Sequence, residues 1–322
     1  MLIRPLFSLT LLLTLACLLL ASLARTWGQQ HPSPLLAYIT DGIDTASQQY
    51  VMDINHRLSL NLGSTLSTAP VWSADGRLVF TSQRDGNTEI YVWNEQSLAN
   101  ISQNSAHDWN PAWSMDGRLA FVTDRDGNRE IYVWDGVSLT NVSQNLASDF
   151  SPTWSADGRV AFVSEHHGNR EIYVWDGQSL TNISQNPGYD QVPQWGADGR
   201  LAFESGRDGN AEIYIWDGQT LTNISQNPAY DYAPVGSVDG RFAFVSYRDG
   251  NAEIYVWDGQ SLTNISQNLS NDLLLAWSID GRLAFVSYRD GNAEIYLWDG
   301  QTLSNLTQTP TIDEYLSALW TP

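Results

Sequence analysis

The chain has no lysine and almost no cysteine. All 16 basic residues are arginine, and 36 aspartates and glutamates outnumber them, which leaves a formal net charge of −20 over 322 residues. This charge argues against nucleic acid or an anionic membrane surface as a partner. The only cysteine, Cys17, lies in an N-terminal apolar run, so the rest of the chain can form no disulfide and has no thiol chemistry.

Histidine is also scarce, and the motifs of common catalytic sites are missing. The five histidines are scattered and make no zinc-binding pattern. The G-x-S-x-G motif of serine hydrolases is absent. Residues 124–128, with Glu130, have some alternating oxygens of a calcium loop, but the full spacing is lacking and a hairpin loop is favoured. We therefore expect no cofactor, no metal site and no catalytic residue.

The N-terminus has the pattern of a targeting segment. Arg4 precedes an apolar run over residues 6–23, and Ser22 and Ala24 are small residues at the positions that a signal peptidase reads. We predict a cleaved signal peptide over residues 1–24, with an uncleaved membrane anchor or a lipoprotein at Cys17 as alternatives. Residues 25–34 are predicted to be a linker. Each alternative places the protein outside the cytoplasm: periplasmic, secreted, or held at the membrane by this segment alone.

The remaining chain is built from one repeated unit. The sequence W-S-A-D-G-R-L-A-F-V-S-x-R-D-G-N-x-E-I-Y-V-W-D-G-x-S-L-T-N-I-S-Q-N returns every 41 residues with few changes. A period of this length, with four short apolar runs per unit, is typical of a β-propeller blade. We therefore predict an all-β fold over residues 35–322, in which stacked repeats share one continuous core.

Each blade is expected to contain four antiparallel strands, which we call a, b, c and d. They correspond to P-x-W-S, R-L-A-F-V-S, E-I-Y-V-W-D and L-T-N-I-S. The a–b and c–d connections are D-G turns, in which glycine supplies the positive φ that a tight hairpin needs. Strands b and c are apolar on both faces, as expected for sheets packed between two neighbours, and the tryptophan of strand c should lie between blades.

The number of runs predicts seven blades. The first unit, beginning at Leu35, has runs for strands b, c and d but lacks strand a, whereas an additional strand a run occurs at residues 316–320. Residues 35–322 make 288 positions, against 287 for seven units of 41. We predict a seven-bladed ring closed by pairing of its N- and C-terminal strands, which would remove free sheet edges. Six complete blades with flanking segments are the alternative.

The motif P-x-W-S-x-D-G-R-L-A-F, followed by G-N-x-E-I-Y-V-W-D and L-T, resembles the WD-like propeller repeat of the TolB type. The resemblance covers residues 35–322 and implies a rigid binding platform outside the cytoplasm. It does not extend to the N-terminal domain of TolB, and the expected blade number differs from the six of TolB. Such propellers also occur beside the hydrolase domain of prolyl-oligopeptidase-like enzymes.

One rim of the ring is the expected binding surface. The d–a connections and the b–c loops project there, because strand direction alternates. The candidate residues that contact a ligand or partner are an aspartate repeated in register and its aromatic neighbours: Asp108, Trp109, Asp149, Phe150, Tyr189, Asp190, Tyr230, Asp231, Tyr232, Asp272 and Asp313. The residues expected to support the rim are Arg84, Arg125, His166, Arg207, Arg248 and Arg289.

Two interpretations of the aspartates remain open. They either tie down their loops by pairing with arginine or accepting backbone hydrogen bonds, or they contact a ligand directly. For the whole chain we expect a monomeric, non-enzymatic binding or scaffold propeller whose partner is a protein or peptide. The alternatives are a glycan-binding propeller, with aromatic side chains stacked on sugar rings, and a carbohydrate-active enzyme of propeller fold.

Overall fold

The computed structural model describes residues 35–41, 47–53, 59–64, 71–94, 96–278 and 280–307. Every regular element in these ranges is a β-strand, and the strands form one three-stranded and six four-stranded sheets. The predicted signal peptide at 1–24, the linker at 25–34, Asp313 and the predicted closing strand at 316–320 lie outside the described residues.

The strands of the four-stranded sheets fall into the four predicted classes. The a strands are β4 (Val71–Trp72), β8 (Asp108–Trp113), β12 (Asp149–Trp154), β16 (Asp190–Trp195), β20 (Asp231–Gly236) and β24 (Asp272–Trp277). The b strands are β5 (Leu78–Ser82), β9 (Leu119–Thr123), β13 (Val160–Ser164), β17 (Leu201–Ser205), β21 (Phe242–Ser246) and β25 (Leu283–Ser287).

The outer two classes are shorter and equally regular. The c strands are β6 (Glu89–Trp93), β10 (Glu130–Trp134), β14 (Glu171–Trp175), β18 (Glu212–Trp216), β22 (Glu253–Trp257) and β26 (Glu294–Trp298). The d strands are β7 (Leu98–Asn100), β11 (Leu139–Asn141), β15 (Leu180–Asn182), β19 (Leu221–Asn223), β23 (Leu262–Asn264) and β27 (Leu303–Asn305). The three-stranded sheet contains β1 (Leu35–Asp41), β2 (Ser47–Asp53) and β3 (Ser59–Ser64).

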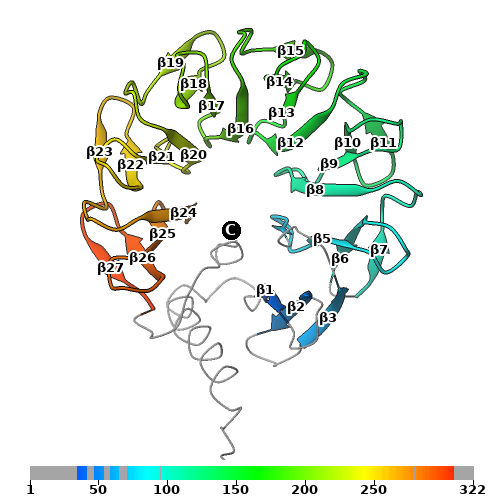
Figure 1. The fold of residues 1–322 in the computed structure, drawn as a ribbon. Coiled ribbons are helices and arrows are strands. Elements are labelled where there is room, and N and C mark those ends of the chain that lie inside the picture. The colour runs from blue at the N-terminus through cyan, green and yellow to red at the C-terminus, as the bar shows by residue number, and fades with distance from the viewer. Residues whose placement is uncertain are drawn as a thin grey trace, which may run out of the picture.

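The six four-stranded sheets follow one another around a common centre (Figure 1), with the a strands innermost and the d strands outermost. Within each sheet the order is a-b-c-d and every pairing is antiparallel, as the D-G turns predict. In the three-stranded sheet, Tyr38 pairs with Tyr50 and Tyr50 with Asn61. These are the pairings of strands b, c and d, so this sheet corresponds to the predicted unit that lacks strand a.

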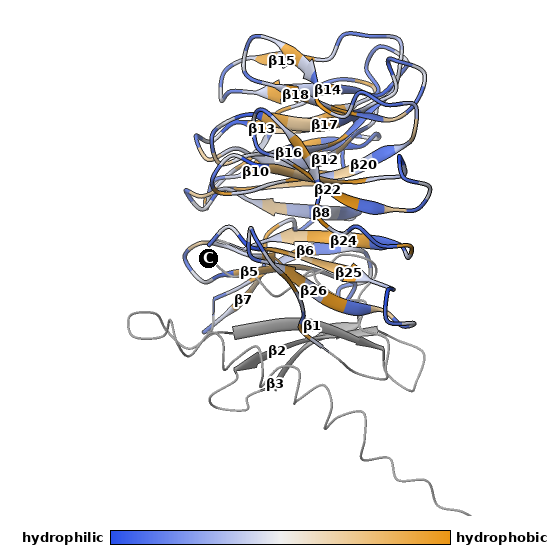
Figure 2. Ribbon diagram, turned by 90° about the vertical axis from the view of Figure 1, so that its left-hand side faces the viewer, coloured by the Kyte–Doolittle hydropathy of each residue, from blue (hydrophilic) through white to orange (hydrophobic). Residues whose placement is uncertain are grey.

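The core lies between adjacent sheets. One cluster contains Val122 and Ile131 of one sheet together with Val160 and Phe162 of the next, and Trp175 of strand c packs against it. The b strands are buried along their whole length, which explains why their sequence is apolar on both faces. Figure 2 shows the same division: apolar residues concentrate on the strands and polar residues on the loops of both rims.

Strand a is longer than the predicted P-x-W-S run. In β8, β12, β16, β20 and β24 it begins three residues earlier, at the repeated aspartate, because a β-bulge carries the chain past the proline position. The bulge places Asn110, Ser151, Val192 and Ala233 at positive φ, between 51° and 56°. Proline follows each of these residues, where its missing N–H does not interrupt the ladder. The aspartates therefore lie at the start of strand a, not within the d–a connection.

Five D-G-R turns, from the turn at Asp75 to the turn at Asp239, bind the next blade. The Nη2 of Arg77 donates to the carbonyl of Gly117 at 3.1 Å, and its guanidinium lies 4.5 Å from the ring centre of Trp113. In return, Nε1 of Trp113 donates to the carbonyl of Val71 at 3.2 Å. The same arginine–glycine bond recurs at 2.7–3.2 Å for Arg118–Gly158, Arg159–Gly199, Arg200–Gly240 and Arg241–Gly281. We call this contact the blade latch.

Candidate functional site

The d–a connection and the b–c loop of one blade lie side by side. A backbone hydrogen bond joins them, for example from the Glu165 amide to the Ser148 carbonyl at 3.0 Å and from the Tyr247 amide to the Tyr230 carbonyl at 3.0 Å. The two loop sets therefore share one rim, as alternating strand direction predicts. We call this surface the loop rim, and it lies opposite the D-G-R turns.

The repeated aspartates form the frame of the loop rim. Asp108, Asp149, Asp190, Asp231 and Asp272 are all fully buried. One carboxylate oxygen accepts from the asparagine four residues earlier, as in Asn227–Asp231 at 2.7 Å. In four blades the other oxygen accepts from a rim arginine. The pairs, with their Nη2–Oδ1 distances, are Arg125–Asp108 at 3.2 Å, Arg207–Asp190 at 3.5 Å, Arg248–Asp231 at 3.3 Å and Arg289–Asp272 at 3.4 Å.

Burial changes the protonation behaviour of Asp149, Asp231 and Asp272. Desolvation raises the pKa of Asp231 and Asp272, and the neighbouring arginine and serine hydroxyls partly offset that rise. Desolvation also raises the pKa of Asp149, to about 6; the Ser164 and Ser143 hydroxyls offset part of this rise, and the negative charge of Glu130 adds to it. Asp149 is the one rim aspartate among the described blades β8–β27 whose partner position holds histidine, at His166, in place of arginine.

The rim arginines also stack on the strand c tyrosines. The guanidinium of Arg84 lies 4.6 Å from the ring centre of Tyr91, and that of Arg248 lies 4.3 Å from Tyr255. Such cation–π contacts contribute about 0.5–2 kcal/mol each, depending on burial. The tyrosine hydroxyl in turn donates to the aspartate of R-D-G-N, as in Tyr255–Asp249. Each arginine is thus enclosed by its own blade and supports the rim.

A second buried network was not anticipated from the sequence. The first residue of strand c is a buried glutamate, and in Glu253 its oxygens accept from the Ser266 hydroxyl at 2.7 Å and the Asn268 amide at 3.1 Å. Asn251 donates to Glu253 at 3.2 Å and to the carbonyl of Ser270 at 2.8 Å. The repeated letters G-N-x-E and S-Q-N were the available signal. This network fastens the d–a connection to strand c.

The predicted aromatic residues differ in exposure. Trp109 and Phe150 are half-buried against the core, with Arg129 and Arg170 at 5.5 and 5.2 Å from their ring centres. Tyr232 is also half-buried. Tyr189 and Tyr230 are exposed, at 39% and 62%.

Two further exposed tyrosines were missed from the sequence. Tyr247 and Tyr288 precede R-D-G-N in their b–c loops, at a position that varies from unit to unit. The Tyr247 ring stacks on Tyr232 with 5.9 Å between centres. We call Tyr189, Tyr230, Tyr247 and Tyr288 the tyrosine arc, since they come from the loops of three consecutive blades.

A buried glutamate lies beneath the arc. Glu204 occupies a position where the other b strands of this region have valine, and it is only 6% exposed. Its Oε2 accepts from Gln191 Nε2 at 2.9 Å and its Oε1 accepts from the Ala233 amide of the next blade at 2.8 Å. Its charge contributes to the raised pKa values of Tyr189 and Tyr232, in which desolvation is the largest cause. The sequence signal was L-A-F-E-S in place of L-A-F-V-S.

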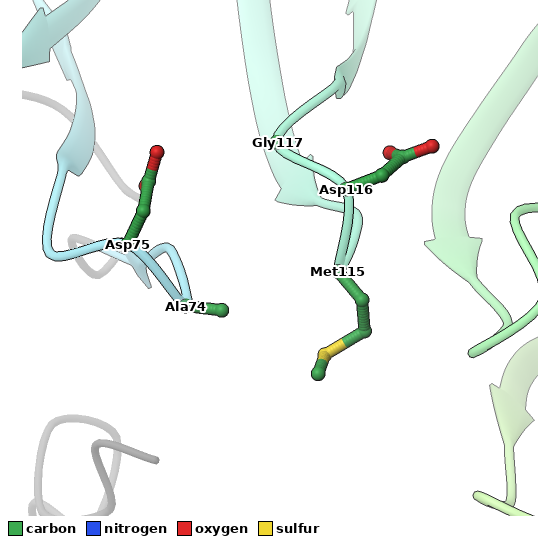
Figure 3. A pocket seen from close by; sticks show the side chains of 5 residues that line it. All are labelled: Ala74, Asp75, Met115, Asp116 and Gly117. Carbon is green, nitrogen blue, oxygen red and sulfur yellow. The ribbon is translucent and has the colours of Figure 1, made fainter.

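On the opposite rim, neighbouring D-G-R turns flank shallow hollows, one of which has a volume of about 240 Å³. Figure 3 shows its lining, where the side chains of Met115 and Asp116 leave the same turn in different directions. Asp75 and Asp116 are each paired with the arginine of their own turn. Within the described ranges there is no group of three histidine, cysteine, aspartate or glutamate side chains placed to hold a metal ion. The same ranges hold no helix that could cross a membrane.

Comparison with solved structures identifies the fold. The β-propeller domain of the Trilobed protease from Pyrococcus furiosus superposes with a TM-score of 0.63 at 17% identity, covering 86% of this chain and 95% of that one. The S511A mutant of puromycin hydrolase, complexed with PGG, gives a TM-score of 0.64 at 13% identity, covering 91% of this chain and 55% of that one. The chain folds as a β-propeller. Against acylaminoacyl peptidase from Pyrococcus horikoshii, it spans 50% of the peptidase's length.

TolB is also among the structurally similar proteins. TolB from Agrobacterium tumefaciens is 24% identical, with a TM-score of 0.48 over 65% of this chain and 84% of that one, which is too low to support an assignment. No family model matches the sequence, and no curated protein matches it. The comparisons therefore show the β-propeller fold, and the TolB-type resemblance of the repeat stays an expectation from the sequence.

Proposed function

We propose that this propeller is a non-enzymatic binding platform outside the cytoplasm, and that it engages a protein or peptide through the loop rim. The observation that carries the proposal is that, on this rim, one set of residues fixes the loops and a different set is exposed to a partner. The aspartates, arginines and glutamates that recur in each unit are buried or enclosed and fix the loops. Among the positions that vary, those of the tyrosine arc are exposed. Variable residues on a rigid frame are what a recognition surface requires.

The tyrosine arc is the proposed contact surface. Tyrosine supplies a large, rigid, amphipathic area at low conformational cost, and it is enriched among residues that dominate binding energy. The buried aspartates would serve the partner by holding these loops in place. Because aromatic faces beside polar groups also suit sugar rings, a glycan is the second candidate, and a glycan array distinguishes the two.

Loss of three arc residues tests the proposal. The triple variant Tyr189→Ala, Tyr230→Ala, Tyr247→Ala of the full chain is expected to capture its partner from envelope extract or culture fluid at least about tenfold less well than wild type. Its melting temperature should stay within a few degrees of the wild-type value, because these side chains lie at the surface and outside the core clusters.

The matched control is Met115→Ala with Val238→Ala, two exposed apolar residues on the opposite rim. These changes should leave capture intact. Equal capture by wild type and the tyrosine variant, or loss of capture in the control, would contradict the proposal.

We further propose that the ring has seven blades, closed when residues 316–320 add strand a to the sheet β1–β3. This rests on the count of runs and on the three-stranded order β1-β2-β3, which lacks the inner strand that the other sheets have. Deletion of residues 308–322 is then expected to lower the melting temperature by roughly 5–10 °C, which corresponds to about 2–3 kcal/mol.

Deletion of residues 1–24 serves as the control and should leave that temperature unchanged. If both deletions leave it unchanged, the ring is open, as the open velcro topology described for the Trilobed protease propeller would suggest.

A further inference from the structure

Four blades hold a partly buried arginine of the loop rim against a fully buried aspartate, and these arginines define a guanidinium socket. In the blade β20–β23, Nη2 of Arg248 donates to Asp231 Oδ1 at 3.3 Å and to the Ser225 carbonyl at 3.2 Å. Its Nε donates to the Ser246 hydroxyl at 2.8 Å, and its plane lies 4.3 Å from the ring centre of Tyr255. A carboxylate, a carbonyl, a hydroxyl and an aromatic face together match the donors and the flat cation of a guanidinium group.

The blade β12–β15 keeps this socket but lacks its arginine. Asp149, Ser143, Ser164 and Tyr173 occupy the four socket positions, and His166 stands where the arginine would be. Asp149 is 0% exposed, and its Oδ2 accepts from Asn145 at 2.7 Å. Its Oδ1 has no hydrogen-bond partner among the described residues. A buried carboxylate oxygen without a hydrogen-bond partner destabilises the fold, so a donor that enters this socket would be bound favourably.

The histidine does not replace the arginine contacts. The backbone amide of His166 donates to the Ser164 hydroxyl at 3.3 Å, which is the contact that the sister arginines make through their own amides. Its imidazole is exposed and packs edge-on against Tyr173, with 6.5 Å between ring centres. A second histidine, His167, takes the place of the aspartate that accepts from the tyrosine hydroxyl elsewhere. This blade has thus exchanged an arginine and an aspartate for two exposed imidazoles.

We propose that the socket of Asp149, Ser143, Ser164 and Tyr173 binds a guanidinium group from outside, the side chain of an arginine in the peptide partner. The chain itself supplies the template, because it fills the equivalent socket with a guanidinium in four other blades. Asp149 is fully buried, so an entering guanidinium must displace neighbouring side chains, and the residue at the arginine's position, His166, is exposed. The raised pKa of Asp149 accords with a carboxyl that lacks its cation. The inference rests on the proposed peptide-binding function, of which it names one specificity element.

The test uses the full chain and L-arginine amide as the probe. Calorimetry is expected to show saturable binding of one molecule per chain, and the imidazole NMR signals of His166 should shift along the same curve. L-citrulline amide, which has nearly the same shape but no charge, should bind at least about tenfold more weakly. Asp149→Asn should weaken binding of arginine amide by a similar factor.

Two further variants separate this site from a nonspecific charge effect. His166→Arg fills the socket from within the chain and should abolish binding while preserving the fold. Arg248→His with Asp249→His copies the β12–β15 loop into a sister blade and should raise the stoichiometry to two. Absence of saturable binding to wild type, or unchanged binding in His166→Arg, would overturn the inference. If arginine amide binds as expected but loss of the tyrosine arc does not affect partner capture, the socket stands and the proposed function fails.

Discussion

Replacement of His166 by arginine is expected to stabilise the folded protein by about 1–3 kcal/mol near neutral pH, because a charge-assisted hydrogen bond to a buried carboxylate contributes about this much. The substitution restores the residue that four sister blades carry, on the same backbone and beside the same four socket groups. The buried Oδ1 of Asp149 would gain the partner that it lacks. Chemical denaturation of wild type and variant measures the difference.

This gain should depend on pH. The pKa of Asp149 is raised to about 6 in the folded state from an ordinary value of 3.8. Between these values the folded state binds a proton that the unfolded state has released, so wild-type stability falls as pH rises through this window. A neighbouring guanidinium lowers the pKa of Asp149 and removes that loss. The free energy of unfolding of His166→Arg should therefore exceed that of wild type by the largest amount near pH 7.5 and by much less near pH 4.5.

His167→Arg is the matched control for His166→Arg. It adds the same side chain to the same loop, at the position where the sister blades place aspartate and not arginine. Its effect should stay within about 0.5 kcal/mol. Equal stability of His166→Arg and wild type at both pH values would show that Asp149 is already satisfied, and the socket argument would then be wrong.

Truncation of Glu253 to alanine is expected to cost about 3–5 kcal/mol, since each buried polar group left without a partner costs about 1–3 kcal/mol. The Ser266 hydroxyl and the Asn268 amide would both lose their acceptor. Asn251 would keep its bonds to the Asn268 and Ser270 carbonyls but lose its third partner. A buried network that is partly satisfied is less favourable than one that is complete.

The loss of stability in Glu253→Ala should appear first in the d–a connection that Glu253 holds and only then in the rest of the blade. Hydrogen exchange at the Asp272 amide, which donates to the Ala252 carbonyl at 2.8 Å, should accelerate more than exchange within the strands β20–β22. Glu253→Gln retains the shape and part of the hydrogen bonding and should cost about half as much. Glu165→Ala removes a glutamate that lies at the surface of a rim loop and should change stability by less than about 0.5 kcal/mol. Equal costs for Glu253→Ala and Glu165→Ala would contradict the role assigned to the network.

The sequence predicted those parts of the fold that local chemistry decides. The D-G turns require positive φ at glycine, and Gly76 and Gly136 have φ values of 83° and 98°. The length of strand a could not be predicted, because its bulge places Asn110 and Val192 at positive φ. A β-branched residue resists that conformation, so only the surrounding tertiary structure explains it. Closure of the ring stays a prediction.

The candidate site was predictable in position but not in exposure. The aspartate register and the replacement of arginine by His166 were both visible in the repeat. Whether a rim side chain is buried depends on the neighbouring blade, which no single unit encodes. Trp109 therefore proved to be half-buried, whereas Tyr247 is exposed. The unpaired oxygen of Asp149 likewise required coordinates.

The blade latch affects how the number of repeat units can change during evolution. Each latch arginine reaches the carbonyl 40 residues ahead, and the latch makes no direct contact beyond that neighbour. Gain or loss of one whole 41-residue unit by unequal recombination would therefore leave the remaining latches intact. Evolution can thus alter the number of units in one step, without a change in the contacts between the units that remain.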